Sequence, residues 1–411
     1  MCDVLIVGAG PAGAIAGLVL ARAGVRVRIV DRASFPRDKL CGDTVNPGTL
    51  ARLRALGVAD AIVARGLRVD GMVVTGEGGV SIEGRYPAGA HGRAIVRREL
   101  DWLLLQAAID AGCEFEPGVN VRAAVCDEGN RPQVRGVIAA SRGGEVRIDA
   151  PLTIAADGRR SAIGFGLGIA RHPARPRRWA IGAYYGDFGV RLVSASDDPD
   201  ADTSLTPTLL GEMHVRRGRY IGVAPVPGGL TNVCLVRPAR PGDTELGDPI
   251  ALLARELRCD GMLRDRAAAA RMVAPPVVLG PLAVDADARA ALDGLLFAGD
   301  AAGFIDPMTG DGLRFAVRGG ELAAAAALRA LAHGWRGVHA RLAAERRAEF
   351  GGKWRFNRAL RALVASPRAV GMAAAGARLA PAVMQRVIAR AGDCHVRSAC
   401  PPPPKASLGP P

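Results

Sequence analysis

The sequence predicts an α/β protein with a parallel-sheet domain, an inserted antiparallel sheet and a helical C-terminal region. Two apolar runs without polar alternation, residues 4–7 and 25–30, flank an Ala-rich helical stretch that stops at Gly24. Such runs are typical of parallel strands that are buried on both faces. Residues 70–95 and 171–278 instead alternate and are broken by Gly, Pro and Asp, which indicates antiparallel strands with turns.

The remaining elements follow the same periodicities. In chain order we predict a helix pair over 49–65 broken at Gly57, a helix over 96–112, short strands over 119–154, a hairpin turning at Gly228 and Gly229, a strand over 295–298, a long Ala-rich helix after it, and basic helices beyond residue 337 broken at Pro367 and Pro381.

Length and composition restrict the protein class. A chain of 411 residues is too long for one ordinary core, so two packed domains are expected. The net charge of +14 comes almost wholly from Arg, and without a recognition motif it predicts no nucleic-acid partner. The eight Cys form no C-x-x-C pair, which predicts no metal site and a reduced, cytoplasmic setting. No apolar run is long enough for a membrane span, and no signal peptide is expected.

The first strand leads into a glycine-rich turn with the spacing G-x-G-x-x-G. Gly8 makes the tight turn, Gly10 lets a pyrophosphate approach the backbone, and Gly13 lets the helix pack close to the strand. Asp31, 18 positions after Gly13, ends the next strand and can accept hydrogen bonds from ribose hydroxyls. This Rossmann-like unit predicts an ADP-containing dinucleotide and leaves NAD and FAD open.

Two later segments favour a flavin. Asp157 and Gly158 follow a short strand, where an ordinary turn is the competing interpretation. Asp300 ends the strand at 295–298, and a helix begins near Gly312 after a loop. The carboxylate suits ribityl hydroxyls, and free amides at Gly312 and Leu313 suit the edge of the ring that gains negative charge on reduction.

In this order the segments resemble the FAD-dependent oxidoreductases of the aromatic-hydroxylase type, which include group A flavoprotein monooxygenases, geranylgeranyl reductases and flavin-dependent halogenases. "VRRELD" is similar to their R-x-x-L-D element, and "FPRDKLCGD" to the P-x-x-x-x-C-G element of the geranylgeranyl-reductase branch. The resemblance covers residues 1–335. It implies non-covalent FAD contacted by Gly8, Gly10, Pro11, Ala12, Gly13, Asp31, Arg32, Arg37, Cys41, Gly42, Arg97, Asp157, Gly158, Gly299, Asp300, Gly310, Gly312 and Leu313.

The resemblance also implies a discontinuous domain organisation. The FAD-binding domain is expected over 1–60, 95–165 and 275–335, and an inserted antiparallel-sheet substrate domain over 60–95 and 165–275. A helical C-terminal region over 336–395 and a flexible Pro-rich tail over 396–411 complete the chain.

The sequence indicates the reaction less specifically than it indicates the cofactor. We slightly favour oxygen-dependent hydroxylation or epoxidation of a hydrophobic small molecule through a flavin hydroperoxide. The alternative is reduction of a C=C bond in a prenyl or polyketide substrate, and a non-catalytic flavin carrier ranks below both. "KLCG" favours the reductase branch, but its Y-x-W-x-F-P strand is here "RYIGVAPVP", in which we place Ile221 and Val223 at the bulky positions. The halogenase pattern W-x-W-x-I-P is absent.

Catalytic side chains and partners stay open. Cys41, Asp43 and Pro307 are candidates near the flavin, and Asp306 and Asp311 either handle protons or serve as loop and cap residues. No second dinucleotide turn is present, so electrons are expected from transiently bound NAD(P)H or an external reductase. The basic C-terminal helices either cap the substrate domain or contact an anionic membrane peripherally.

Overall fold

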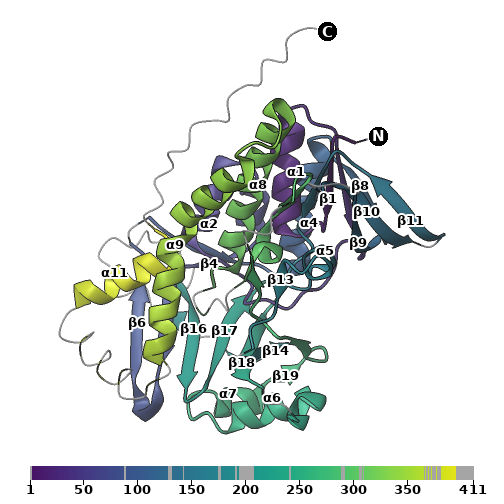
Figure 1. The fold of residues 1–411 in the computed structure, drawn as a ribbon. Coiled ribbons are helices and arrows are strands. Elements are labelled where there is room, and N and C mark those ends of the chain that lie inside the picture. The colour runs from purple at the N-terminus through teal and green to yellow at the C-terminus, as the bar shows by residue number, and fades with distance from the viewer. Residues whose placement is uncertain are drawn as a thin grey trace.

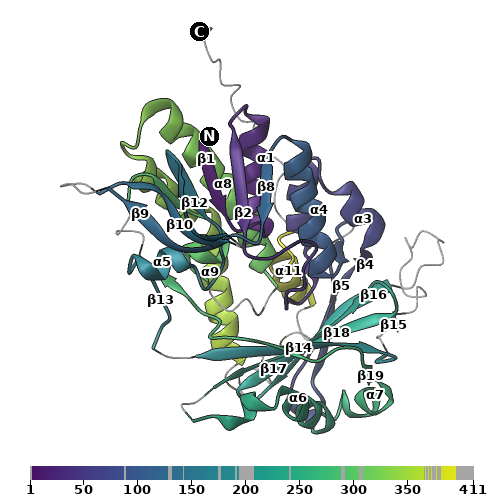
Figure 2. The same ribbon diagram turned by 90° about the vertical axis from the view of Figure 1, so that its right-hand side faces the viewer.

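The computed structural model describes residues 2–87, 89–127, 132–141, 143–174, 177–189, 192–193, 208–239, 242–287, 292–304, 308, 310–364, 366, 369, 372, 376 and 381–394. Two sheets of different character dominate it (Figures 1 and 2). The structure confirms the predicted class, which is a mixed α/β protein with a Rossmann-like parallel sheet, antiparallel sheets and C-terminal helices.

The first sheet is parallel and assembled from distant segments. Its described strands run in the order β22 (Leu295–Phe297), β12 (Leu152–Ala155), β1 (Val4–Val7), β2 (Val27–Asp31) and β8 (Glu114–Pro117). Every pairing is parallel, with Ile6 between Ile154 and Ile29. All the strands' carboxyl ends therefore meet at one edge.

The central strand is buried on both faces, as its apolar run predicts. Val4 and Ile6 pack with three helices, α1 (Pro11–Arg22), α4 (Arg97–Asp110) and α8 (Gly312–His333). Leu5 and Val7 pack on the other face with a three-stranded antiparallel sheet of the described chain, β9 (Asn120–Cys126), β10 (Val134–Ser141) and β11 (Gly144–Asp149).

The second sheet is largely antiparallel and has nine strands within the described residues. Its path is β19 (Arg271–Met272), β14 (Arg178–Gly186), β18 (Leu230–Pro238), β17 (Arg219–Val226), β16 (Thr208–Arg216), β5 (Gly71–Thr75) and β6 (Ser81–Arg85), with β15 (Leu192–Val193) on β16 and β20 (Val277–Leu279) on β14. The predicted hairpin is β17–β18, and Gly228 and Gly229 both have positive φ. Helices α6 (Pro249–Arg258) and α7 (Arg264–Ala269) cover its far face (Figure 2).

Smaller elements join the two sheets. They are β3 (Thr44–Val45), α2 (Pro47–Ala55), α3 (Asp60–Arg65), β4 (Leu67–Val69), β7 (Gly92–Ala94), α5 (Ala162–Gly166), β13 (Ala170–Arg171), β21 (Asp285–Ala286) and the short 3₁₀ helices η1 (Glu77–Gly79), η3 (Thr244–Gly247) and η4 (Gly299–Ala302).

The C-terminal region is helical in its described part. Helix α9 (Val338–Val364) packs on α8, where the ring of Phe350 meets Phe315 edge-on at 5.1 Å, and α11 (Pro381–Ala391) packs on β6 (Figure 1). Within the described residues no helix has the length and apolarity to cross a membrane. The Pro-rich tail and Pro367 lie outside the described residues, and the predicted domain boundaries stay a prediction.

Candidate functional site

The turn after β1 can only be built with glycine. Gly8 has a φ of 101°, and a Cβ there would lie 2.5 Å from the carbonyl oxygen of Ala156. A Cβ on Gly13 would lie 1.9 Å from the carbonyl oxygen of Gly8. Above Gly10 the space is open, with Arg37 Nη2 the nearest atom at 3.5 Å. The result is a cradle beside the first amides of α1, where a phosphate can approach the backbone.

Asp31 completes the predicted dinucleotide unit. At the end of β2 its Oδ2 accepts from the backbone N–H of Ala9 at 2.8 Å, and its Oδ1 accepts from that of Ala33 at 2.8 Å. These bonds hold the carboxylate next to the glycine turn. Arg32, by contrast, is exposed and does not line the cavity described next.

A cavity of about 270 Å³ begins at this turn and extends to the antiparallel sheet. Most of the predicted cofactor residues line it: Gly10, Pro11, Ala12, Cys41, Gly42, Arg97, Gly158, Gly299, Asp300, Gly310, Gly312 and Leu313. Gly8, Gly13 and Asp31 do not line it, but they build and brace the adjacent turn. The structure thus brings segments from residue 8 to residue 313 together at one place.

Asp157 has a structural contact. Its Oδ2 accepts from the N–H of Ala162 at the start of α5 at 2.9 Å, and burial raises its pKa. This contact fits the turn interpretation. The neighbouring residue Gly158, whose φ is 83°, lines the cavity.

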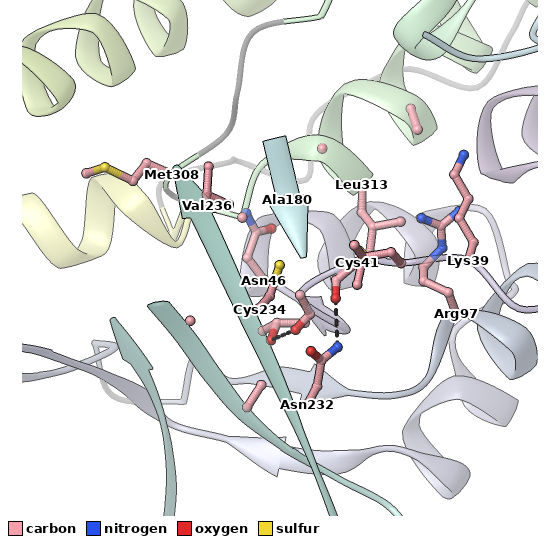
Figure 3. Close-up of a pocket in the computed structure, with 18 of the residues that line it drawn as sticks. Lys39, Cys41, Asn46, Arg97, Ala180, Asn232, Cys234, Val236, Met308 and Leu313 are labelled. Carbon is pink, nitrogen blue, oxygen red and sulfur yellow. Dashed lines mark hydrogen bonds between the residues drawn. The ribbon is translucent and has the colours of Figure 1, made fainter. Parts of the chain in front are cut away.

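Cationic side chains gather at one end of the cavity. Arg97 is buried and makes a two-pronged ion pair with Asp101 at 2.7 and 2.8 Å, and Arg37 reaches the same Asp101 at 3.1 Å. Lys39 lies beside Arg97 (Figure 3). Burial is the main cause that lowers the pKa of the Lys39 ammonium group, and the positive charge of Arg97 is the second. Arg159 also lines the cavity, and burial lowers its pKa to about 10. A concentration of positive charge next to the glycine cradle suits a pyrophosphate.

Asp43 ties the loop that carries Cys41 to helix α4 and to the antiparallel sheet. It is fully buried, with a φ of 51°. Its Oδ1 accepts from the backbone N–H of Arg97 at 3.1 Å, and its Oδ2 accepts from the hydroxyl of Tyr184 at 2.6 Å and from Asn232. Burial raises the pKa of Asp43 to about 6, although these hydrogen bonds oppose the shift. Asp43 lies behind the cavity wall and acts on the cavity through the Cys41 loop.

The sheet wall of the cavity is apolar and has small residues at its centre. Four neighbouring strands contribute mostly alternate residues to it: Ala180, Gly211, Met213, Tyr220, Gly222, Ala224, Asn232, Cys234 and Val236, with Glu212 and Val223 between them. A Cβ on Gly222 would have the carbonyl oxygen of Cys234 as its nearest atom, at 3.9 Å, and one on Gly211 the carbonyl oxygen of Gly71, also at 3.9 Å. A Cβ at either position would therefore make only ordinary van der Waals contact, on the wall of the cavity.

The placement of Ile221 and Val223 at the bulky motif positions is wrong. Both side chains belong to the core on the opposite face, packed with α6, although Val223 also borders the cavity. Because side chains alternate along a strand, the residues that follow Tyr220 on the cavity face are Gly222 and Ala224. Counting from Tyr220 in Y-x-W-x-F-P gives the same two positions. The aromatic residues of the motif are thus replaced by smaller residues than the placement of Ile221 and Val223 suggested, and the replacement lies on the cavity wall.

Several site residues were missed. Lys39, Asn46, Arg159 and Asn232 line the cavity, and Asn232 interrupts the otherwise apolar end of "LTNVCLV", a signal that could have drawn notice. Pro307 and Asp306 lie outside the described residues. Asp311 sits directly before α8 without capping it through its side chain.

These residues fit FAD. The cradle at Gly10 leaves room for a pyrophosphate, Lys39, Arg97 and Arg159 supply positive charge, and Asp31 and Asp300 present carboxylates at two strand ends. The amides around Gly312 and Leu313 line the other side of the same cavity. Such a cofactor supplies two-electron chemistry, while the protein positions and shields it.

Comparisons with known proteins agree with this geometry. Residues 1–184 match the family model described as an FAD binding domain. Menaquinone reductase of Mycobacterium tuberculosis is 32% identical over 340 residues, which cover 78% of this chain and 75% of the relative. Digeranylgeranylglycerophospholipid reductase 2 of Methanopyrus kandleri is 29% identical over 334 residues, 80% and 77% of the two chains.

A flavin-dependent brominase of known structure shares the fold, with a TM-score of 0.78 at 21% identity over 96% of this chain and 94% of that chain; the TM-score of its triple mutant is 0.79. Its triple mutant aligns over 96% of this chain and 95% of that chain at 20% identity. The chain therefore carries an FAD binding domain and is an enzyme of the FAD-dependent oxidoreductase family.

Proposed function

We propose that this protein reduces carbon–carbon double bonds in an isoprenoid chain. The observation that carries the proposal is the cavity wall opposite the cofactor residues. It is largely apolar and carries no large side chain at Gly211, Gly222 and Ala224, so a slim hydrocarbon chain can lie across the sheet. The substrates named in the two relatives, a menaquinone and a digeranylgeranylglycerophospholipid, both carry long isoprenoid chains, which supports this choice.

The reaction balances as the addition of a hydride and a proton. With FAD held at this site, one alkene carbon would receive a hydride and the other a proton, and the reduced FAD would supply the two electrons. NAD(P)H or a separate reductase protein must return those electrons. The contribution of this chain is to hold the cofactor through the glycine cradle and the cations, and to exclude water from the alkene with the apolar wall.

Oxygen-dependent hydroxylation or epoxidation is the second candidate. The observation that favours it is the replacement of the aromatic positions of the reductase strand by Gly222 and Ala224 on the cavity wall. The electrons would then go to O₂, and one oxygen atom would enter the product.

One experiment separates the two reactions. FAD-loaded protein is photoreduced without oxygen and mixed with a geranylgeranyl lipid, which has no quinone ring that could take up the two electrons. Reduction predicts anaerobic reoxidation of the flavin and a product heavier by two hydrogens. The proposal fails if the flavin stays reduced until oxygen is admitted and label from oxygen gas then enters the product. Free photoreduced FAD with the same substrate is the control.

A further inference from the structure

A buried carboxylate lies directly before the helix that faces the cofactor cavity. Asp311 is fully buried and immediately precedes α8, whose first residues, Gly312 and Leu313, line the cavity. Its Oδ1 accepts from Asn46 Nδ2 at 3.3 Å, and its Oδ2 accepts from Asn357 Nδ2 at 3.1 Å. A carboxylate this far from water needs compensation by positive charge.

That charge comes from the C-terminal region. Lys353 on α9 is 2% exposed, and its Nζ lies 3.0 Å from Asp311 Oδ1. The same ammonium donates to the carbonyl oxygens of Arg390 and Ala391 at the end of α11, at 2.6 and 2.8 Å. One side chain thereby connects the start of α8 with the end of α11.

Asp393 makes a second connection at the same place. It has a φ of 53°, and its carboxylate lies 3.4 Å from Lys353 Nζ and 2.7 Å from Nε of Arg314 in the first turn of α8. The carbonyl oxygen of Gly392 accepts from the N–H of Gly48 at 3.0 Å. A Cβ on Gly392 would lie 2.5 Å from the ring of Tyr86, which lines the cavity. The end of α11 is therefore packed against the cavity wall.

The position of this pair gives it an electrostatic effect on the cofactor. Reduction adds negative charge to the flavin edge expected near Gly312 and Leu313, and an uncompensated charge on Asp311 would oppose it through the low-dielectric interior. Lys353 cancels that charge. We infer that Lys353 is a positioning residue through which the C-terminal helices set the reduction potential of the bound flavin. This role holds whether the substrate is reduced or oxygenated.

The test is a charge cycle on the FAD-loaded full chain. The flavin midpoint potential is measured against reference dyes in the wild type, Lys353→Met, Asp311→Asn and the double variant. We expect a lower potential in Lys353→Met, a higher one in Asp311→Asn, and a return toward the wild-type value in the double variant. A merely structural role would not restore the potential when a second buried group is changed.

The control removes a different ion pair between the same two helices. Arg329 on α8 pairs with Glu345 on α9 at 2.9 Å, about 25 Å along α8 from Gly312. Arg329→Met should leave the potential unchanged. An unchanged potential in Lys353→Met, or equal shifts in Lys353→Met and Arg329→Met, would overturn the inference. If Lys353→Met fails to fold, the near-isosteric Asp311→Asn decides alone, and an unchanged or lowered potential there is the contrary result.

Discussion

The side-chain nitrogen of Asn232 on β18 lies 2.7 Å from the carbonyl oxygen of Cys41, a residue 191 positions earlier in the chain. Figure 3 shows this bond to Cys41. Asn232 donates to the carboxylate of Asp43 as well, so one amide holds both ends of the turn that carries Cys41 and Gly42 into the cavity. The antiparallel sheet thereby holds a loop that lines the cavity.

Asn232→Ala should loosen this loop. The change removes both hydrogen bonds and leaves the buried carbonyl of Cys41 without this donor, so we expect a loss of about 1–3 kcal/mol in the free energy of unfolding. FAD affinity should fall as well, because Cys41 and Gly42 line the cavity. Urea unfolding and FAD titration measure the two effects. Asn120→Ala on the exposed edge of β9 is the control, and equal effects of both variants would contradict the prediction.

Asp43 should give the protein an unusual pH dependence. Burial raises its pKa to about 6 in the folded protein, above the ordinary value of 3.8. The folded state therefore binds this proton more tightly than the unfolded state, so the group stabilises most below pH 4 and that stabilisation is lost as the pH rises to about 6. Between these pH values the unfolding free energy of the wild type should fall by at most about 1.4 kcal/mol per pH unit because of Asp43. Asp43→Asn should remove this fall.

The measurement is urea unfolding of wild type and Asp43→Asn at several pH values across this window. Asp149→Asn, on strand β11, controls for the loss of one exposed carboxylate. Parallel pH profiles for wild type and Asp43→Asn would show that Asp43 titrates as an ordinary carboxyl group.

Two glycines of the same turn should respond differently. Gly13→Ala places a Cβ 1.9 Å from a backbone oxygen, so the fold itself should be lost or strongly destabilised. A Cβ on Gly10 would contact only the end of the Arg37 side chain, at 3.5 Å, so Gly10→Val should keep the fold, but it occupies the volume that the pyrophosphate needs. Circular dichroism reports folding, and visible absorbance reports bound FAD. A folded, yellow Gly10→Val protein would mean that the nucleotide binds elsewhere.

Gly222→Trp tests the substrate half of the cavity. The new ring would extend from the sheet wall into open space, so we expect KM for an isoprenoid substrate to rise by about tenfold or more, or about 1.4 kcal/mol of binding. FAD affinity should stay unchanged, because the cofactor residues lie across the cavity. Ile221→Val, on the opposite face of the same strand, is the matched control. A weaker FAD complex with an unaltered KM would place the cofactor, and not the substrate, against this wall.

The sequence by itself determined the dinucleotide unit. Gly8, Gly10, Gly13 and Asp31 lie within one contiguous strand–turn–helix–strand, and each has a local requirement: a positive φ, a missing Cβ or a strand end. Local requirements can be recognised in a local pattern, and the parallel and antiparallel sheets likewise follow from runs and alternation of apolar residues.

Only the tertiary structure decided how distant segments meet. Alternation shows that Ile221 and Gly222 face opposite ways, but not which of them faces the cavity, because that depends on which side of the sheet α6 covers. Asn232 with Cys41 and Lys353 with Asp311 are pairs formed by chain crossings that no spacing in the sequence encodes. Their hydrogen bonds and charges become strong only where packing excludes water, and the packing exists only in the assembled fold.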